Sequence, residues 1–301
     1  MFKGVNAIEF SNRFKSNEDC YLYLVEIKWG NAYQCVRCGC RESYKGRTYY
    51  YRRCKSCGYN ESVTANTVFH GMKMPVLKAF HMVFRLTAKK KGMSTVELGA
   101  EVGVQQMTAW LFKRKLQLVM KKDKKDKLIG EVHVDETIVG GYSCGEPGRS
   151  LLTKSAVFMA VEILEDGRTG NIDMEHIENF EAATLKYAIK DCIADDAKIK
   201  SDKFHSYKKL EKELPNLETH YSDKGSNMDA LHKQIMQFKN WLRGTHHKCS
   251  KEYLYAYIDE YIYRFNKRNM KQWLFDNIIN RLMNEIPHSY SMLKKLCAYS
   301  T

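Results

Sequence analysis

The sequence contains no long uninterrupted apolar run, and this absence excludes several classes of protein. No window approaches the roughly 18 consecutive apolar residues that a membrane-spanning helix needs. The opening residues, MFKGVNAIEF, are too polar for a secretory signal peptide. A glycine-rich phosphate loop is also missing, so we expect no nucleotide cofactor. A content of 44% apolar and 12% aromatic residues still allows a folded core, and we expect a cytoplasmic protein without a membrane partner.

The second part of the chain lacks the positive charge that the first part has in excess. Residues 1–130 carry 25 Lys and Arg against 10 Asp and Glu, whereas residues 131–301 carry 24 against 25. The formal net charge of +14 therefore originates in the first part. A basic region of this kind attracts a polyanion. We expect residues 1–130 to bind nucleic acid.

Four of the ten cysteines form two matched pairs in the basic part. Cys35 and Cys38 enclose two residues, and Cys54 and Cys57 repeat this spacing further along the chain. A glycine follows each pair, which allows the tight turn that brings two thiolates to one ion. A redox-active dithiol is the alternative, but two such pairs in a row favour a structural, tetrahedral zinc site. The tyrosine-rich segment 42–53 between the pairs alternates in polarity and predicts a hairpin.

Residues 75–122 have the pattern of a helix-turn-helix module. Pro75 suits the start of a helix, and Ser94-x-x-Glu97 has the form of a capping box at the start of the next one. Gly103 then makes a turn before a second amphipathic helix. This layout predicts a DNA-binding module, although an ordinary helical pair with a solvated basic face would look similar. Glutamine can read adenine edges and basic residues hold phosphates. The expected DNA contacts are Gln105, Gln106, Thr108, Lys113 and Arg114.

The neutral part begins with a segment that alternates between apolar and polar residues and carries Asp135 partway along it. Further strands are predicted at 156–164, 170–177 and 197–201, with a helix at 182–192 before the last one. Three strands, a helix and another strand predict an RNase H-like α/β domain, a mixed sheet with flanking helices. Asp135 and Asp202 would then lie on neighbouring strands. Each aspartate alone has a surface or capping role as its simpler explanation, but the pair makes sense around divalent cations.

Motifs along nearly the whole chain resemble the insertion sequence 1595 family of transposases. Besides the cysteine pairs they are Thr67-Val-Phe-His70, Gly92-Met-Ser94, Thr108-Ala-Trp110, Val134–Gly141, Ser201-Asp202 with Ser206-Tyr207, Lys239–His247 and Tyr263–Asn266. The resemblance implies an RNase H-like catalytic domain that cuts and rejoins DNA at the ends of its own element, with Asp135 and Asp202 as acidic ligands of catalytic Mg²⁺ or Mn²⁺. It also implies double-stranded DNA partners, namely terminal inverted repeats and target DNA, at least a homodimer in a synaptic complex, and a bacterial or archaeal, nucleoid-associated protein.

The third ligand departs from the Asp-Asp-Glu pattern of that family. His232 stands where relatives with a glutamate carry it, on a predicted helix whose buried stripe includes Leu231 and Phe238. A neutral imidazole can bind a cation and favours Mn²⁺ over Mg²⁺. Three competitors for this position remain open: Asn227, Gln237 and Glu260. Asn227 also suits a helix cap, and Glu260 also suits an ion pair with Arg264.

Further basic and histidine side chains of the second part are expected to contact DNA. They are Arg149, Lys154, Lys239, Arg243, His246 and His247. The predicted organisation is an N-terminal helical segment at 1–30, a zinc ribbon at 31–66, a helix-turn-helix domain at 67–127 and the RNase H-like domain at 128–301. The main alternative to an active enzyme is a regulator that binds DNA through its zinc ribbon and helix-turn-helix while its catalytic domain has decayed.

Overall fold

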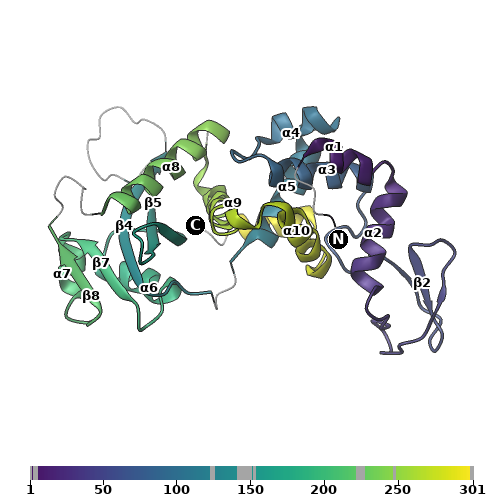
Figure 1. Cartoon of the computed structure of the whole chain (residues 1–301), viewed down its shortest axis with the longest axis horizontal. Coiled ribbons are helices and arrows are strands. Elements are labelled where there is room, and N and C mark those ends of the chain that lie inside the picture. The colour runs from purple at the N-terminus through teal and green to yellow at the C-terminus, as the bar shows by residue number, and fades with distance from the viewer. Residues whose placement is uncertain are drawn as a thin grey trace. The chain divides into compact units, whose positions relative to one another are not determined.

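The chain forms two compact units, and a segment near its C-terminus returns to the first unit. The computed structural model describes residues 2, 6–122, 126–140, 151, 154–221, 228–246 and 249–298. The first unit joins Met1–Val119 to Met270–Leu296, and the second comprises Met120–Asn269 with Cys297–Thr301 (Figure 1). Residues 270–296, which were expected in one domain over 128–301, are thus grouped with the first unit.

Helices make up most of the first unit. They are α1 (Ala7–Arg13), α2 (Asn17–Trp29), α3 (Val76–Ala88), α4 (Thr95–Val102), α5 (Gln106–Met120), α10 (Leu274–Asn284) and α11 (Tyr290–Ala298), with η3 (Arg268–Trp273) leading into α10. The buried stripe of α10, which includes Phe275, Ile279 and Leu282, packs on α2 and α3. Burial of these large apolar side chains favours this position by about 2 kcal/mol each, which explains why the C-terminal segment belongs to the first unit.

Aromatic rings fill the centre of this helical core. Phe275 of α10 lies 5.7 Å from Phe80 of α3 and 5.4 Å from Phe2, measured between ring centroids. Phe14 approaches both Phe80 and Tyr23 at 5.1 Å and 5.3 Å. Most of these pairs meet edge to face, the geometry that aromatic quadrupoles prefer. Segments from both ends of the sequence thus share one core.

A small antiparallel sheet extends the first unit. Its strands β1 (Ser43–Lys45), β2 (Tyr51–Cys54) and β3 (Asn60–Ser62) follow one another in space as in the sequence. Ser43 pairs with Cys54, so the hairpin predicted over 42–53 is confirmed. Lys28 of α2 joins this sheet to the helices, because its ammonium lies 2.8 Å from the fully buried Glu61 and also donates to the carbonyl of Ala65.

The second unit is built on a five-stranded mixed sheet. Its order is β6-β5-β4-β7-β8, in which β4 pairs antiparallel to β5 and parallel to β7. The strands are β4 (Glu131–Gly140), β5 (Lys154–Ile163), β6 (Thr169–Ile177), β7 (Lys198–Asp202) and β8 (Leu217–His220). The RNase H-like mixed sheet with flanking helices is therefore confirmed. Strand β8, at the edge, was missed by the sequence analysis.

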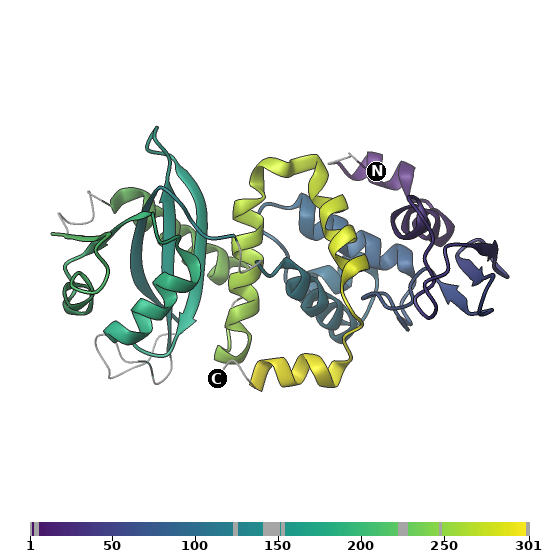
Figure 2. The ribbon, with the colours of Figure 1, turned by 90° about the horizontal axis from the view of Figure 1, so that it is seen from below.

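Helices cover both faces of this sheet (Figure 1; Figure 2). Val132 and Val134 of β4 face a core shared with α6 (Ala182–Cys192) and α7 (His205–Leu210). Val139 of β4 and Met159 of β5 face the other core, which α8 (Asp229–Thr245), η2 (Lys251–Tyr253) and α9 (Leu254–Asn266) enclose. Side chains alternate between the two faces along β4, and Asp135 is four residues from Val139. Asp135 therefore points to the same face as Val139, the one that α8 covers.

Within the described ranges no helix combines the length and the apolar character that a bilayer span requires.

Candidate functional site

The two cysteine pairs lie on two turns of the same construction. Gly39 and Gly58 adopt left-handed backbone angles, with φ of 72° and 67°, which glycine reaches without a steric penalty. The amide of Gly39 donates to the carbonyl of Cys35 at 2.9 Å, and that of Gly58 to the carbonyl of Cys54 at 3.1 Å. The turn predicted from each Cys-x2-Cys-Gly sequence is therefore confirmed.

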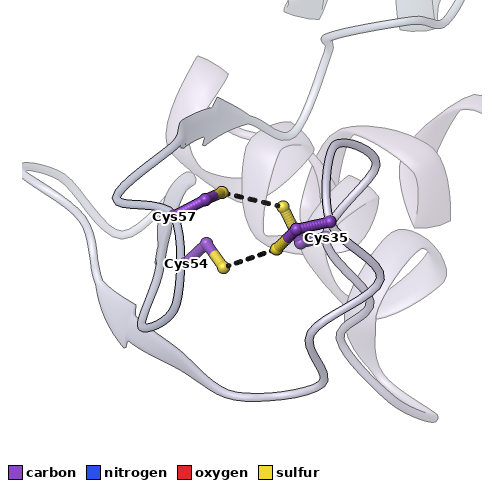
Figure 3. A group of neighbouring side chains, drawn as sticks. Cys35, Cys54 and Cys57 are labelled. Carbon is purple, nitrogen blue, oxygen red and sulfur yellow. Dashed lines mark hydrogen bonds between the residues drawn. The ribbon is translucent and has the colours of Figure 1, made fainter.

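The four sulfur atoms face one point between these turns. They all lie within 4.8 Å of one another, and Figure 3 shows Cys35, Cys54 and Cys57 turned toward each other. The Sγ atoms of Cys35 and Cys57 are 3.6 Å apart, and those of Cys38 and Cys54 are 3.5 Å apart. The backbone amide of Cys57 is the main cause that lowers the pKa of Cys54 to about 6. Four converging thiols fit a structural tetrahedral zinc ion.

The register of the central strands places Asp135 and Asp202 on one face of the sheet. The parallel pairing of β4 and β7 aligns His133 with Lys200. Two residues further along each strand lie Asp135 and Asp202, so both side chains leave the same face of the sheet as His133 and Lys200. Each carboxylate is oriented locally, since Asp135 accepts from the amide of Glu136 at 2.7 Å and Asp202 from that of Phe204 at 3.0 Å. The prediction that Asp135 and Asp202 lie on neighbouring strands is thus confirmed.

Helix α8 brings His232 close to Asp135. The Nδ1 atom of His232 lies 3.9 Å from Oδ2 of Asp135, with side chains that are 42% and 16% exposed. Two turns further along α8, burial lowers the pKa of Lys239, Arg243 lowers it further, and Asp135 opposes both effects. His232 and Lys239 therefore share a helix face directed at Asp135. The buried stripe predicted for this helix, Leu231, Ile235, Phe238 and Leu242, is buried as expected.

The acidic site is looser than the cysteine site. Among the described residues, the four cysteines are the one group of three or more metal-binding side chains whose ligand atoms all lie within 4.8 Å of one another. Asp135, Asp202 and His232 are spaced more widely than that. Their donor types, two carboxylates and an imidazole, still suit a hard divalent cation.

A second layer of polar groups lies behind the carboxylates. Glu136 points to the opposite face from Asp135, as the alternation of a strand requires, and is 8% exposed. Burial raises the pKa of the fully buried Tyr207 well above its ordinary value, and the charges of Glu136, Asp135 and Asp202 raise it further. The hydroxyl of Tyr207, part of the Ser206-Tyr207 motif, is thus close to three carboxylates and stays protonated beneath the site.

Two competitors for the third position, Glu260 and Gln237, lie elsewhere. Glu260 is fully buried on α9, where Arg264 donates to it at 3.2 Å. Helix α9 packs on β6, at the edge of the sheet opposite β7 and β8. The side chain of Gln237 is exposed to solvent. Asn227 lies outside the described residues. The ion pair offered as the simpler explanation of Glu260 is present.

His220 is a neighbour of the site that the sequence analysis missed. It pairs with Asp202 in the parallel register of β7 and β8, so both side chains leave the same face of the sheet. His220 is exposed and lies 3.5 Å from Glu218. Only the recognition of the short edge strand β8 could have revealed this position.

The predicted DNA contacts of the helix-turn-helix divide into exposed and buried ones. Ser94 caps α4 by accepting from the amide of Glu97 at 3.2 Å, and Gly103 forms the turn with a φ of 67°. Gln105 and Gln106 are exposed at the start of α5, with Thr108 half-buried behind them. They remain candidates for base contacts, because the first residues of a recognition helix read base edges.

Lys113 and Arg114 do not lie on a DNA-binding surface, which corrects the prediction. Lys113 is 2% exposed, and its ammonium donates to the carbonyl of Met93 at 2.8 Å. Arg114 is 5% exposed and donates to Gln117 at 3.0 Å. The second half of α5 is buried on most of its circumference, so basic side chains there serve the core of the first unit.

The expected DNA contacts of the second unit are also of different kinds. Arg243 is exposed near the end of α8, and Lys154 is half-buried at the start of β5. His246 is stacked on Tyr257, with ring centroids 4.0 Å apart, and meets the ring of Trp241 at 5.6 Å. This packing favours a structural role for His246 over the expected DNA contact. Arg149 and His247 lie outside the described residues.

Comparisons with known proteins agree with this architecture. Residues 127–266 match the ISXO2-like transposase domain, and residues 15–60 match the transposase zinc-ribbon domain. Among curated proteins no match is found.

Two solved structures resemble the chain loosely. A pre-cleavage Mos1 transpososome is 11% identical over 73% of this chain and 78% of its own, with a TM-score of 0.31. The Mos1 strand transfer complex is 13% identical over 67% and 78%, with a TM-score of 0.19. Likenesses this distant carry no argument about function.

Proposed function

Because the chain belongs to the insertion sequence 1595 family of transposases, we propose that it binds the ends of its insertion element and catalyses metal-dependent cleavage and strand transfer of DNA. The proposal is supported by the register of β4 and β7, which pairs His133 with Lys200 two residues before Asp135 and Asp202, and by the 3.9 Å between His232 and Asp135. Two carboxylates that share one sheet face repel each other unless a cation or protons compensate them. Their position is therefore understandable for a site that works with a divalent cation.

Asp135, Asp202 and His232 are the residues that would hold this cation. When bound, Mg²⁺ or Mn²⁺ activates a water or a 3′-hydroxyl and stabilises the departing oxygen of a phosphodiester. The backbone amides of Glu136 and Phe204 hold the two carboxylates in place beforehand. The imidazole replaces a carboxylate of other family members, which reduces the negative charge of the site and favours Mn²⁺.

Basic residues on α8 would position the DNA strand. Lys239 faces Asp135 and is half-buried, and Arg243 follows one turn later at the surface. A lysine or arginine at this distance from the acids can hold a phosphate next to the scissile one. Arg149, Lys154 and His247 are kept as further candidates for contacts with the backbone.

Recognition of the element ends falls to the first unit. Gln105, Gln106 and Thr108 at the start of α5 would read bases of the terminal inverted repeats, and the zinc ribbon would add phosphate contacts. The basic balance of residues 1–130 supports this division of labour. Synapsis of two ends would require at least a homodimer, acting at the nucleoid in the cytoplasm.

The test is a nicking assay with the purified full-length protein. A supercoiled plasmid that carries the coding sequence with its flanking DNA is incubated with Mn²⁺ or Mg²⁺, and the ends of the nicks are mapped. We expect nicks at the element ends, and joined products when a target plasmid is added. Nicking at random sites, or the same activity in Asp135→Asn, would contradict the proposal.

One observation favours a second function, that of a DNA-binding regulator with a decayed catalytic domain. It is the histidine that stands at the glutamate position of the family. In that case the protein would bind the element ends but nick no DNA with either metal, and His232→Glu would not restore cleavage. A nuclease without strand transfer would nick the plasmid but give no joined products.

A further inference from the structure

A cationic and aromatic pair lies at the carboxyl edge of the sheet, directly after the site residues. Asp202 and His220 are paired in register as the last residues of β7 and β8. The next residue on each side is Lys203 and Tyr221. The Lys203 ammonium lies 3.7 Å from the centroid of the Tyr221 ring, so it contacts a face of that ring. The pair therefore bridges two strand ends beside Asp202.

Tyr221 is unusually accessible for an aromatic side chain. It is 76% exposed, more than any other large apolar or aromatic side chain in the part of the chain that the structure describes. A tyrosine ring in water loses the free energy that its burial would provide. The cation on its face holds the ring in one orientation without covering most of it. Such a ring is arranged for stacking on a flat partner.

The surroundings of the pair carry positive charge within an otherwise balanced half of the chain. Residues 198–212 contain six lysines against one aspartate and one glutamate, whereas residues 131–301 as a whole have 24 basic and 25 acidic side chains. Lys208 and Lys209 of α7 are both exposed, and α7 packs against β8. A polyanion is therefore attracted locally to this edge of the sheet.

We propose that Lys203 and Tyr221 bind one nucleotide that has left the duplex next to the scissile phosphate, with Tyr221 stacking on its base and Lys203 pairing with its phosphate. This inference rests on the proposed function, because it takes Asp202 as part of the cleavage site. Stacking on an aromatic ring is tolerant of sequence, since every base has a π-face. The pair would thus bind the DNA strand next to the scissile phosphate without reading its sequence.

The experiment measures binding to DNA with and without unpaired nucleotides. The full-length Asp135→Asn protein, which leaves the probes uncut, is titrated with a fluorescein-labelled blunt duplex and with the same duplex bearing a single-stranded oligothymidine tail. We expect tighter binding of the tailed probe, and a loss of this preference by about fivefold or more on adding Tyr221→Ala. Tyr221→Trp should keep it. Tyr187→Ala is the matched control, because Tyr187 is 63% exposed on α6.

A second readout distinguishes stacking from charge. A 2-aminopurine in the tail should be quenched on binding, and Tyr221→Ala should abolish the quenching. Lys203→Gln should weaken tail binding and reduce the slope of log affinity against log salt by about one. Absence of a tail preference overturns the proposal, as does equal preference in Tyr221→Ala and Tyr187→Ala. An equal loss on blunt and tailed probes would also overturn it, in favour of a duplex backbone contact. Because no cleavage is measured, these outcomes are independent of whether the protein is a transposase.

Discussion

The cysteine site of the first unit and the acidic site of the second unit are assembled in opposite ways. The cysteines lie on two local turns, each closed by its own backbone hydrogen bond, and their sulfurs lie within 4.8 Å of one another. Asp135, Asp202 and His232 come from two strands and a helix that are far apart in the sequence. Their meeting depends on strand register and helix packing. A site made of local turns is compact as soon as the turns form, whereas a group of side chains from distant elements is spaced more widely.

The largest effect is expected where the acidic site loses a proposed ligand. Asp135→Asn should reduce metal-dependent nicking by roughly a thousandfold or more, because an amide neither carries the charge nor binds the cation as a carboxylate does. Zinc content and binding to the element ends should remain. Plasmid nicking and metal analysis measure both properties. Asp166→Asn is the control, since Asp166 lies on an exposed loop with Arg168; a similar loss there would remove Asp135 from the site.

The next effect concerns the attachment of the zinc ribbon to the helices. Lys28→Met should destabilise the first unit by about 3 kcal/mol, because it leaves the fully buried Glu61 without its partner. Chemical denaturation followed by tryptophan fluorescence checks this. The exposed pair of Lys55 with Glu42 is the matched comparison, and Lys55→Met should cost below about 1 kcal/mol. Equal costs would mean that Lys28 and Glu61 act as a surface pair.

Loss of a zinc ligand should affect one unit alone. Cys35→Ser should release the metal, unfold roughly residues 30–62 and weaken end binding by about thirtyfold, while the second unit keeps its fold. Zinc content, gel-shift titration and limited proteolysis report these changes. Cys40→Ser is the control, because Cys40 lies outside the group of four sulfurs. Unchanged end binding in Cys35→Ser would separate the ribbon from DNA recognition.

The smallest effect is a change in metal preference. His232→Glu should shift the ratio of nicking rates in Mg²⁺ and Mn²⁺ toward Mg²⁺ by about tenfold, because a carboxylate is a harder ligand than an imidazole. Lys233→Glu, one residue further along α8 at an exposed position, should leave the ratio unchanged. Nicking rates of wild type and both variants, measured in parallel in Mg²⁺ and in Mn²⁺, test this prediction. The same ratio in wild type and His232→Glu would remove His232 from the ligand set.

Sequence patterns predicted best what short segments determine. The turns at Gly39 and Gly58, the cap at Ser94 and the strand with Asp135 each follow from a few neighbouring residues. The edge strand β8 was missed, because four residues provide little periodicity, and His220 and Tyr221 were missed with it. Lys113 and Arg114 were misjudged, because a basic residue on an amphipathic helix gives no indication of which neighbouring helix covers it. Asp135 and His232 were paired through family resemblance, and only the packing of α8 on the sheet explains their 3.9 Å separation.

The return of the chain to the first unit has a consequence for how the protein is made. Met270–Leu296 leaves the ribosome after residues Met120–Asn269 of the second unit, yet Phe275 belongs to the aromatic core of the first. The helices that would read DNA therefore complete their core only after the sheet with Asp135 and Asp202 has been synthesised. A fragment that stops at Val119 would leave the apolar sides of α2 and α3 uncovered and prone to association. A DNA-binding fragment of this protein must therefore carry α10 with it.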